Sequence, residues 1–84
     1  MAHYYFHVHN STGVSRDDEG IDAPDFAAAR SHAVAGIRSI IGEEAKTGRL
    51  DLRGYIEVND ERDETLLIIR FEEAFQVFRG DEAT

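Results

Sequence analysis

The chain has 84 residues, carries a net charge of −8 from nine basic and seventeen acidic residues, and contains no cysteine. The lack of cysteine excludes disulfides, thiolate zinc sites and cysteine nucleophiles. The basic residues are scattered and do not form the positive face that phosphate contacts require, so we expect no direct binding of nucleic acid. A basic protein partner, by contrast, fits an acidic surface.

The length and the hydropathy pattern indicate one small domain outside the membrane. A chain of this size buries roughly 60% of its unfolded surface, so its stability is marginal without further support. The N-terminus lacks the basic start and apolar run of a signal peptide, and no apolar stretch approaches the roughly 20 residues that span a bilayer. We expect a cytoplasmic protein with a single domain over residues 1–80 and a mobile tail at 81–84.

The first predicted element is a strand over residues 3–9, HYYFHVH. Side chains alternate between the two faces of a strand. One face is apolar and carries Tyr4, Phe6 and Val8. The other face carries the three histidines and a tyrosine: His3, Tyr5, His7 and His9. The first set is predicted to pack in the core, and the second to lie on an exposed sheet face or at an interface.

A second strand follows the turn signal NSTG (10–13), in which Gly13 is free to take a positive φ. The apolar residues Val14 and Ile21 differ in parity, so one regular strand cannot send both to the same face. We infer a bulge or a break within DDEG (17–20), where Gly20 suits the strained position.

The longest predicted element is a helix from about residue 24 to 47. Asp22 or Asp25 can cap its N-terminus, and Pro24 suits the first turn. Gly48 ends it. Its apolar residues recur at three- and four-residue spacing and form one stripe: Phe26, Ala29, Ala33, Ile37, Ile40 and Ile41.

Three elements are predicted after the helix. GYIEVND (54–60) is a third strand with Ile56 and Val58 on one face, and NDERDE (59–64) turns the chain into a fourth strand, TLLIIRF (65–71). FEEAFQVF (71–78) is predicted to be a short C-terminal helix with one apolar stripe: Phe71, Ala74, Phe75 and Phe78. The fold class is therefore α+β, a small antiparallel four-stranded sheet in the order β-β-α-β-β-α with one long helix on one face.

The fourth strand is apolar on both faces, the pattern of a strand buried on two sides. It carries Leu66, Leu67, Ile68 and Ile69. Because one helix covers only one face, either the C-terminal helix or another subunit must cover the second. We predict a homodimer, in which a partner subunit or the C-terminal helix buries Leu66, Ile68, Phe75 and Phe78.

His7 and His9 point the same way with Cα atoms roughly 6.6–6.8 Å apart, and two imidazoles at that spacing can converge on one zinc or copper ion. A third ligand can come from Asp17, Asp18 or Glu19 across the hairpin. The hairpin register is open: one alternative puts Asp18 opposite His7, and the other puts Arg16 there, which opposes metal binding. The same histidines equally fit a sheet face or interface without a metal, and we expect no cofactor.

Enzymatic activity is not predicted. Serines are present, but there is no G-x-S-x-G elbow, no phosphate-cradling glycine loop and no H-E-x-x-H. The acidic segments DDE (17–19) and NDERDE (59–64) read as solvated turns and lack the ligand spacing of an EF-hand.

Five segments together resemble a family of small bacterial proteins: YYFHV near the start, the D-x-E-G turn (17–20), APDFAAAR opening the helix, GRLDL after it and GYIEVND in the third strand. That family is catalogued as a domain of unknown function and is frequent in alphaproteobacteria. The likeness covers about residues 3 to 75. It implies a bacterial cytoplasmic domain and supplies no catalytic residue.

A fainter likeness is to HicB-type antitoxin domains, which also begin with an aromatic strand, pass through an acidic-glycine turn and enter a helix as IDAPDFAAARSHA (21–33) does here. The third strand before the helix is missing or reduced, and no DNA-binding helix-turn-helix or ribbon-helix-helix follows. This likeness implies an acidic protein that neutralises a basic toxin.

These features favour a small, acidic, non-enzymatic interaction domain of unknown cellular role that forms a homodimer. Tyrosine and histidine combine apolar area with a polar tip, which suits an interface. The predicted contact surface is therefore the non-core face of the first strand, Tyr5, His7 and His9, with Arg16 or Asp18 nearby. The alternatives are a metal-binding regulator that uses His7 and His9, and an antitoxin-like partner of a basic protein.

Overall fold

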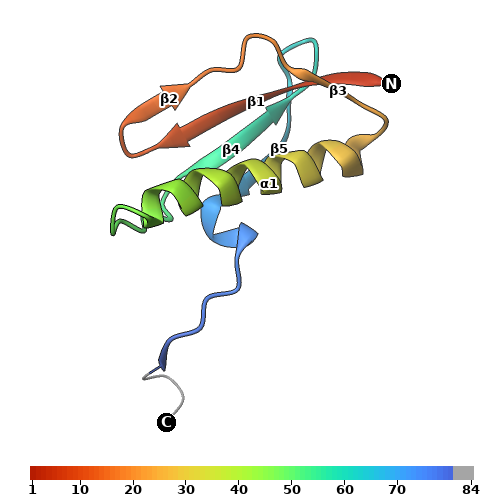
Figure 1. Ribbon diagram of the computed structural model, residues 1–84. Helices are drawn as coiled ribbons and strands as arrows, with labels where there is room; N and C mark the ends of the chain where they lie inside the picture. The colour runs from red at the N-terminus through yellow and green to blue at the C-terminus, as the bar shows by residue number, and fades with distance from the viewer. Residues whose placement is uncertain (81–84) are drawn as a thin grey trace.

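The computed structural model describes residues 1–80 and contains an antiparallel sheet with one long helix across one face (Figure 1). Strand β1 (Ala2–Asn10) lies inside the sheet, between β4 (Tyr55–Asn59) and two short strands, β2 (Gly13–Ser15) and β3 (Ile21–Ala23). Strand β5 (Thr65–Arg70) pairs with β4 and forms the far edge. The predicted α+β class is confirmed, but the sheet has five strands instead of four.

The fifth strand arises because the second predicted strand is interrupted between β2 and β3, both of which pair with β1. Within the interruption, Gly20 has a φ of 68°. A Cβ atom at this position would lie 2.6 Å from the carbonyl oxygen of Tyr4, so both the backbone angle and the space require glycine. The break inferred from the parity of Val14 and Ile21 is therefore the gap between these two strands.

His3 fastens β1 to the β3 side through both of its ring nitrogens. Nδ1 lies 2.6 Å from Asp22 Oδ1, and Nε2 lies 2.6 Å from the carbonyl oxygen of Glu19. Both partners are acceptors, so the protonated ring satisfies both contacts at once. The Asp22 side chain first, and then the Glu19 carbonyl, raise the pKa of His3 above its ordinary value of 6.5.

The raised pKa of His3 predicts a pH-dependent part of the stability. A pKa that is higher in the folded state adds stability that is complete below pH 6.5 and is lost as the pH rises through the folded-state pKa. We expect the melting temperature of the wild type to exceed that of His3→Gln in mild acid, and the difference to shrink as the pH rises. His32→Gln is the control, because that ring packs against Phe6 instead. A difference that is independent of pH would contradict the role of the charged ring.

Helix α1 (Phe26–Ala45) lies across one face of the sheet (Figure 1). The Asp25 side chain caps it by accepting a hydrogen bond from the Ala28 N–H at 2.8 Å, which decides between the two predicted caps. Gly48 follows it with a φ of 85°, as its role in ending the helix requires. Four of the six predicted stripe residues are buried, namely Ala29, Ala33, Ile37 and Ile41. Phe26 and Ile40 lie at the margin of the contact.

The core lies between α1 and the sheet face that carries the alternating apolar residues. Registers pair Phe6 with Val58 and Val58 with Leu67, so these three side chains share the face below α1. The buried hydrophobic residues of the three long strands on this face are Tyr4, Phe6, Ile56, Val58 and Ile69. The small side chains of Ala29 and Ala33 let the helix approach this face closely.

The predicted C-terminal helix is wrong. The chain forms only one 3-10 turn, η1 (Phe71–Ala74), and Phe75 already has an extended backbone with φ −136° and ψ 152°. Phe71 and Ala74 are buried and Phe75 packs partly against the core, whereas Phe78 is 86% exposed. A helix of two turns is unstable in water unless one face is packed. Here the turn over residues 71–74 packs against α1, and residues 76–80, which follow Phe75, are exposed. The predicted tail at 81–84 lies outside the described residues.

Strand β5 is apolar on both faces, as predicted, but only one face is covered. Leu67 and Ile69 point towards α1, and Ile69 is 2% exposed. Leu66 and Ile68 point to the other face and are 42% and 50% exposed. Up to residue 80, the C-terminal segment leaves this strand uncovered, so the described residues do not provide the first of the two predicted covers.

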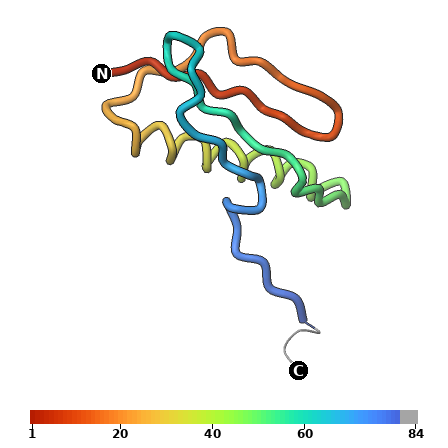
Figure 2. Tube along the Cα trace, turned by 180° about the vertical axis from the view of Figure 1, so that it is seen from behind, coloured from red at the N-terminus to blue at the C-terminus, as the bar shows by residue number. Residues whose placement is uncertain are grey.

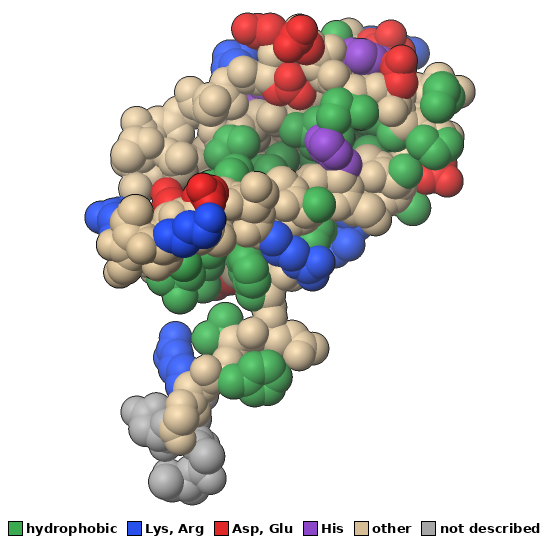
Figure 3. Space-filling model, viewed as in Figure 1, with side chains coloured by type: hydrophobic (Ala, Val, Ile, Leu, Met, Phe, Trp, Pro, Cys, Tyr) green, Lys and Arg blue, Asp and Glu red, His purple; other side chains and the backbone are tan. Residues whose placement is uncertain are grey.

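A groove separates α1 from the side of the sheet that carries β2 and β3. It has a volume of about 410 Å³, and Phe6, Val8 and Ile40 are among its lining residues. Figure 3 shows hydrophobic side chains gathered in this hollow. Within residues 1–80, no helix has the length and apolar character needed to cross a membrane.

Candidate interaction surface

The sheet face that points away from α1 is the candidate surface, and we call it the open face (Figure 2). Registers place His7 beside Glu57 and Glu57 beside Ile68, and they place His9 beside Tyr55 and Tyr55 beside Arg70. The residues of the open face on the three long strands are His3, Tyr5, His7, His9, Tyr55, Glu57, Asn59, Leu66, Ile68 and Arg70. The face therefore has polar and aromatic groups over β1 and β4, and an apolar margin, Leu66 and Ile68, on β5.

His9 and Glu57 form a connected group over the middle of the open face. His9 Nε2 lies 2.8 Å from Glu57 Oε1, and its ring stacks on Tyr55 with ring centres 4.4 Å apart. The Thr65 hydroxyl donates to the other carboxylate oxygen of Glu57 at 3.2 Å. The Asn59 side chain lowers the pKa of Glu57 most, and the hydrogen bonds from His9 and Thr65 add to this against the opposing effect of burial. The carboxylate is thus held ionised by its neighbours.

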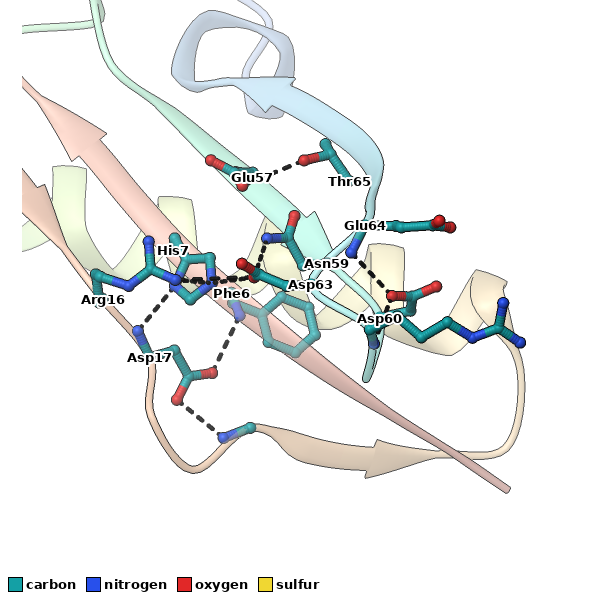
Figure 4. A network of polar contacts seen from close by, with 12 residues as sticks. Phe6, His7, Arg16, Asp17, Glu57, Asn59, Asp60, Asp63, Glu64 and Thr65 are labelled. Carbon is teal, nitrogen blue, oxygen red and sulfur yellow. Dashed lines mark hydrogen bonds and ion pairs between the residues drawn. The ribbon is translucent and has the colours of Figure 1, made fainter.

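His7 is buried, although the sequence predicted it on an exposed face (Figure 4). The backbone N–H of Asp17 donates to its Nδ1 at 3.0 Å. Nε2 lies 4.0 Å from Asp63 Oδ1 and 3.5 Å from Arg16 Nη2. Arg16 and Asp17, on the segment that links β2 to β3, contact the ring from one side and Asp63 approaches it from another. Among the two registers considered from sequence, the one that places Arg16 next to His7 is found.

Asp17 holds this turn together. Its carboxylate accepts hydrogen bonds from the N–H groups of Phe6 at 3.0 Å, Gly20 at 3.0 Å and Glu19 at 3.3 Å. Burial by itself raises the pKa of Asp17, but the N–H groups of Gly20, Phe6 and Glu19 outweigh it and bring the pKa below its usual value. Asp17 is therefore a structural anion that fixes the segment above His7.

Asn59 and Asp63 close the other side of the same region. Asn59 Nδ2 donates to Asp63 Oδ1 at 2.9 Å, and Asp63 has a φ of 63° at the tip of the β4–β5 hairpin. The Asp60 carboxylate accepts the N–H groups of Arg62 and Glu64. The two acidic segments thus meet around one hollow of about 220 Å³. Three of its carboxylates, Asp17, Asp60 and Asp63, hydrogen-bond within the protein, which the prediction of merely solvated turns did not include.

The comparison with protein families gives one result. Residues 3–72 match the DUF6894 family, a domain of unknown function. The chain belongs to this family. This agrees with the resemblance to a domain of unknown function that the sequence motifs indicated. No curated protein and no solved structure matches the chain, and for this DUF6894 domain the bacterial setting and the likeness to antitoxins stay predictions.

The DUF6894 domain brings some of the predicted contact residues together and separates others. Tyr5, His7, Arg16 and Asp18 line the same hollow, and His9, Leu66 and Ile68 lie farther along the open face. Phe75 packs partly against the core and Phe78 projects into solvent, so neither completes this surface within the chain. Sequence reasoning placed Tyr55 and Glu57 on the non-core side of their strand but did not select them. The missing information was the β1–β4 register, which puts both beside the histidines.

The zinc or copper site through His7 and His9 stays a prediction, and the geometry defines what it would require. Nδ1 of His7 already accepts an N–H, and its Nε2 faces the Arg16 guanidinium at 3.5 Å. His9 Nε2 is engaged by Glu57. Within the described part of the DUF6894 domain, no group of three or more His, Cys, Asp or Glu side chains is arranged to hold a metal ion. Metal binding through His7 would therefore require its contacts with Asp17 or Arg16 to rearrange.

Proposed function

We propose that this domain acts by binding and not by catalysis, and that its open face binds a second copy of the chain. The observation that carries the proposal is the uncovered margin on β5. Ile68 is 50% exposed and Leu66 is 42% exposed, whereas Ile69, whose side chain points from the same strand towards α1, is 2% exposed. Neighbouring apolar side chains on the one sheet face without a covering layer are typical of a contact surface.

The polar groups of the open face support binding over catalysis. His9 is held by Glu57 and Tyr55, and His7 is held by the Asp17 N–H. General acid–base catalysis needs a group that reaches a substrate proton, and His7 is enclosed, with both ring nitrogens close to other groups of the protein. Fixed polar groups beside tyrosine and aliphatic side chains are the composition of a protein interface.

A second copy suits the open face in both charge and energetics. The chain carries a charge of −8, so most contacts between two copies bring like charges together. Along β4 and β5 the face instead carries Glu57, paired with His9, and the cation Arg70. A two-fold contact buries the same patch on both copies, and a domain of this size gains needed stability from self-association.

The direct test replaces Ile68 with lysine and measures molar mass by light scattering over a concentration series. We expect the wild type to form a dimer and Ile68→Lys to be a folded monomer, because the site is exposed and lies opposite Glu57. The melting temperature of the variant should fall only by the contribution that the dimer makes to stability. Leu50→Lys is the matched control, since Leu50 is 64% exposed in a loop outside the open face. A wild type that remains monomeric at high micromolar concentration contradicts the proposal.

A further inference from the structure

The segment after η1 leaves the body of the protein and exposes apolar side chains. We call residues 76–79, which follow the partly packed Phe75, the arm. Val77 is 50% exposed and Phe78 is 86% exposed. Figures 1 and 3 show the arm running away from the sheet and helix, with hydrophobic side chains along it. An exposed phenylalanine on an extended segment is the type of residue that anchors an interface when a partner surface receives it.

The arm begins on the opposite side of the sheet from Leu66 and Ile68. Arg38 of α1 donates from Nε to the carbonyl oxygen of Ala74 at 2.9 Å, and Ala74 is buried. The N–H of Phe71 donates to the Gly54 carbonyl oxygen at 2.9 Å. These two contacts fix η1 on the helix side. The arm of the same chain would have to turn around the β5 edge to reach the open face, whereas its observed course is outward.

The dimensions of the arm match those of the uncovered strand. The four residues of the arm, when extended, span at most roughly 13–14 Å, and the four residues from Leu66 to Ile69 of β5 cover a similar length. The chain therefore carries two complementary surfaces, an apolar arm and an apolar strand margin, that do not meet within one copy. A two-fold dimer that exchanges arms covers both at once.

We propose that the arm of one copy lies along β5 of a second copy, with Phe78 seated against Leu66 and Ile68 of that copy. This inference rests on the proposed function, because it names the segment that covers the open face. It adds that the dimer is held by exchanged arms. The exchange is reciprocal, so each copy supplies one arm and receives one.

The absence of cysteine makes disulfide trapping a direct test. Two single variants, Ile68→Cys and Phe78→Cys, are purified separately, mixed and oxidised, and both sites are exposed, so folding is preserved. We expect a mixed disulfide dimer that joins the two variants, and a smaller yield when Leu50→Cys replaces Ile68→Cys. Ile40→Cys, at the groove beside α1, serves as a second control position.

Each outcome of the trapping decides between named alternatives. A mixed disulfide through Ile68→Cys supports the exchange. Preferential trapping of Phe78→Cys by Ile40→Cys overturns it and assigns the arm to the groove. A third protein carries both Ile68→Cys and Phe78→Cys in one chain. A disulfide between these two positions of the same chain, in a monomeric protein, overturns the exchange by placing the arm on its own sheet.

A second measurement separates this inference from the proposed function. We expect Phe78→Ser to weaken the dimer by at least about tenfold, the loss typical of an anchoring aromatic, and Leu50→Ser to leave it unchanged. A wild-type dimer that Ile68→Lys dissociates and Phe78→Ser leaves intact overturns the arm exchange and leaves the open-face contact standing. A wild type that is monomeric overturns both.

Discussion

Replacing Asp17 with alanine is expected to lower the free energy of unfolding by about 2–4 kcal/mol. The carboxylate accepts three backbone N–H groups, from Phe6, Glu19 and Gly20. Hydrogen bonds to a charged group contribute about 1.5–3 kcal/mol each, and partial exposure lets water replace some of them. A chain of this length has a total stability of about 4–12 kcal/mol. Urea denaturation with linear extrapolation measures the loss.

Asp18→Ala provides the matched control for Asp17→Ala. It removes the same charge from the adjacent residue, which is exposed at the same hollow. Because the pKa of Asp17 is lowered in the folded state, its contribution is present at neutral pH and is lost as the pH falls through that lowered pKa. The two variants should therefore differ at neutral pH and converge in strong acid. Equal unfolding energies for both at neutral pH would show that the turn does not depend on Asp17.

Elements with a strong local pattern could be predicted from the sequence. The alternation in β1 places Tyr4 and Phe6 in the core, and both are buried. The helix cap at Asp25 and the helix end near Gly48 could be predicted because both signals depend on neighbouring residues only. The parity of Val14 and Ile21 located the break between β2 and β3 for the same reason.

Features that depend on distant contacts could not be predicted. The alternation that puts His7 on the non-core face is correct, yet its burial depends on contacts with residues distant in sequence, Arg16, Asp17 and Asp63. The stripe from Phe71 to Phe78 fits a helix by spacing, but the helix ends when Phe71 and Ala74 are buried against α1. The open face itself required the β1–β4 and β4–β5 registers, which bring Glu57 between His7 and Ile68.

Gly54→Ala is expected to lower the free energy of unfolding by about 3 kcal/mol, the upper part of the range for overpacking a close contact. A Cβ atom at this position would lie 2.4 Å from the His9 carbonyl oxygen and 2.5 Å from Cε2 of Phe71. Neither neighbour can move easily, because His9 is inside the β1–β4 ladder and Phe71 is 2% exposed. Gly42→Ala is the control, since nothing lies within 4 Å of its Cβ position, and in a helix it should stabilise by up to about 1 kcal/mol.

A double-mutant cycle identifies the ring of Phe71 as the source of the strain at residue 54. Phe71→Leu removes Cε2 and Cζ, the two ring atoms that a Cβ at Gly54 would meet. It should therefore cost less in the Gly54→Ala background than in the wild type, by about 1 kcal/mol or more for residues in contact. Additive losses would assign the strain to the His9 carbonyl alone.

Because the Gly54 carbonyl also accepts the Phe71 N–H at the start of η1, Gly54→Ala should loosen the base of the arm. Its dimer should accordingly dissociate at a higher concentration than that of Gly42→Ala.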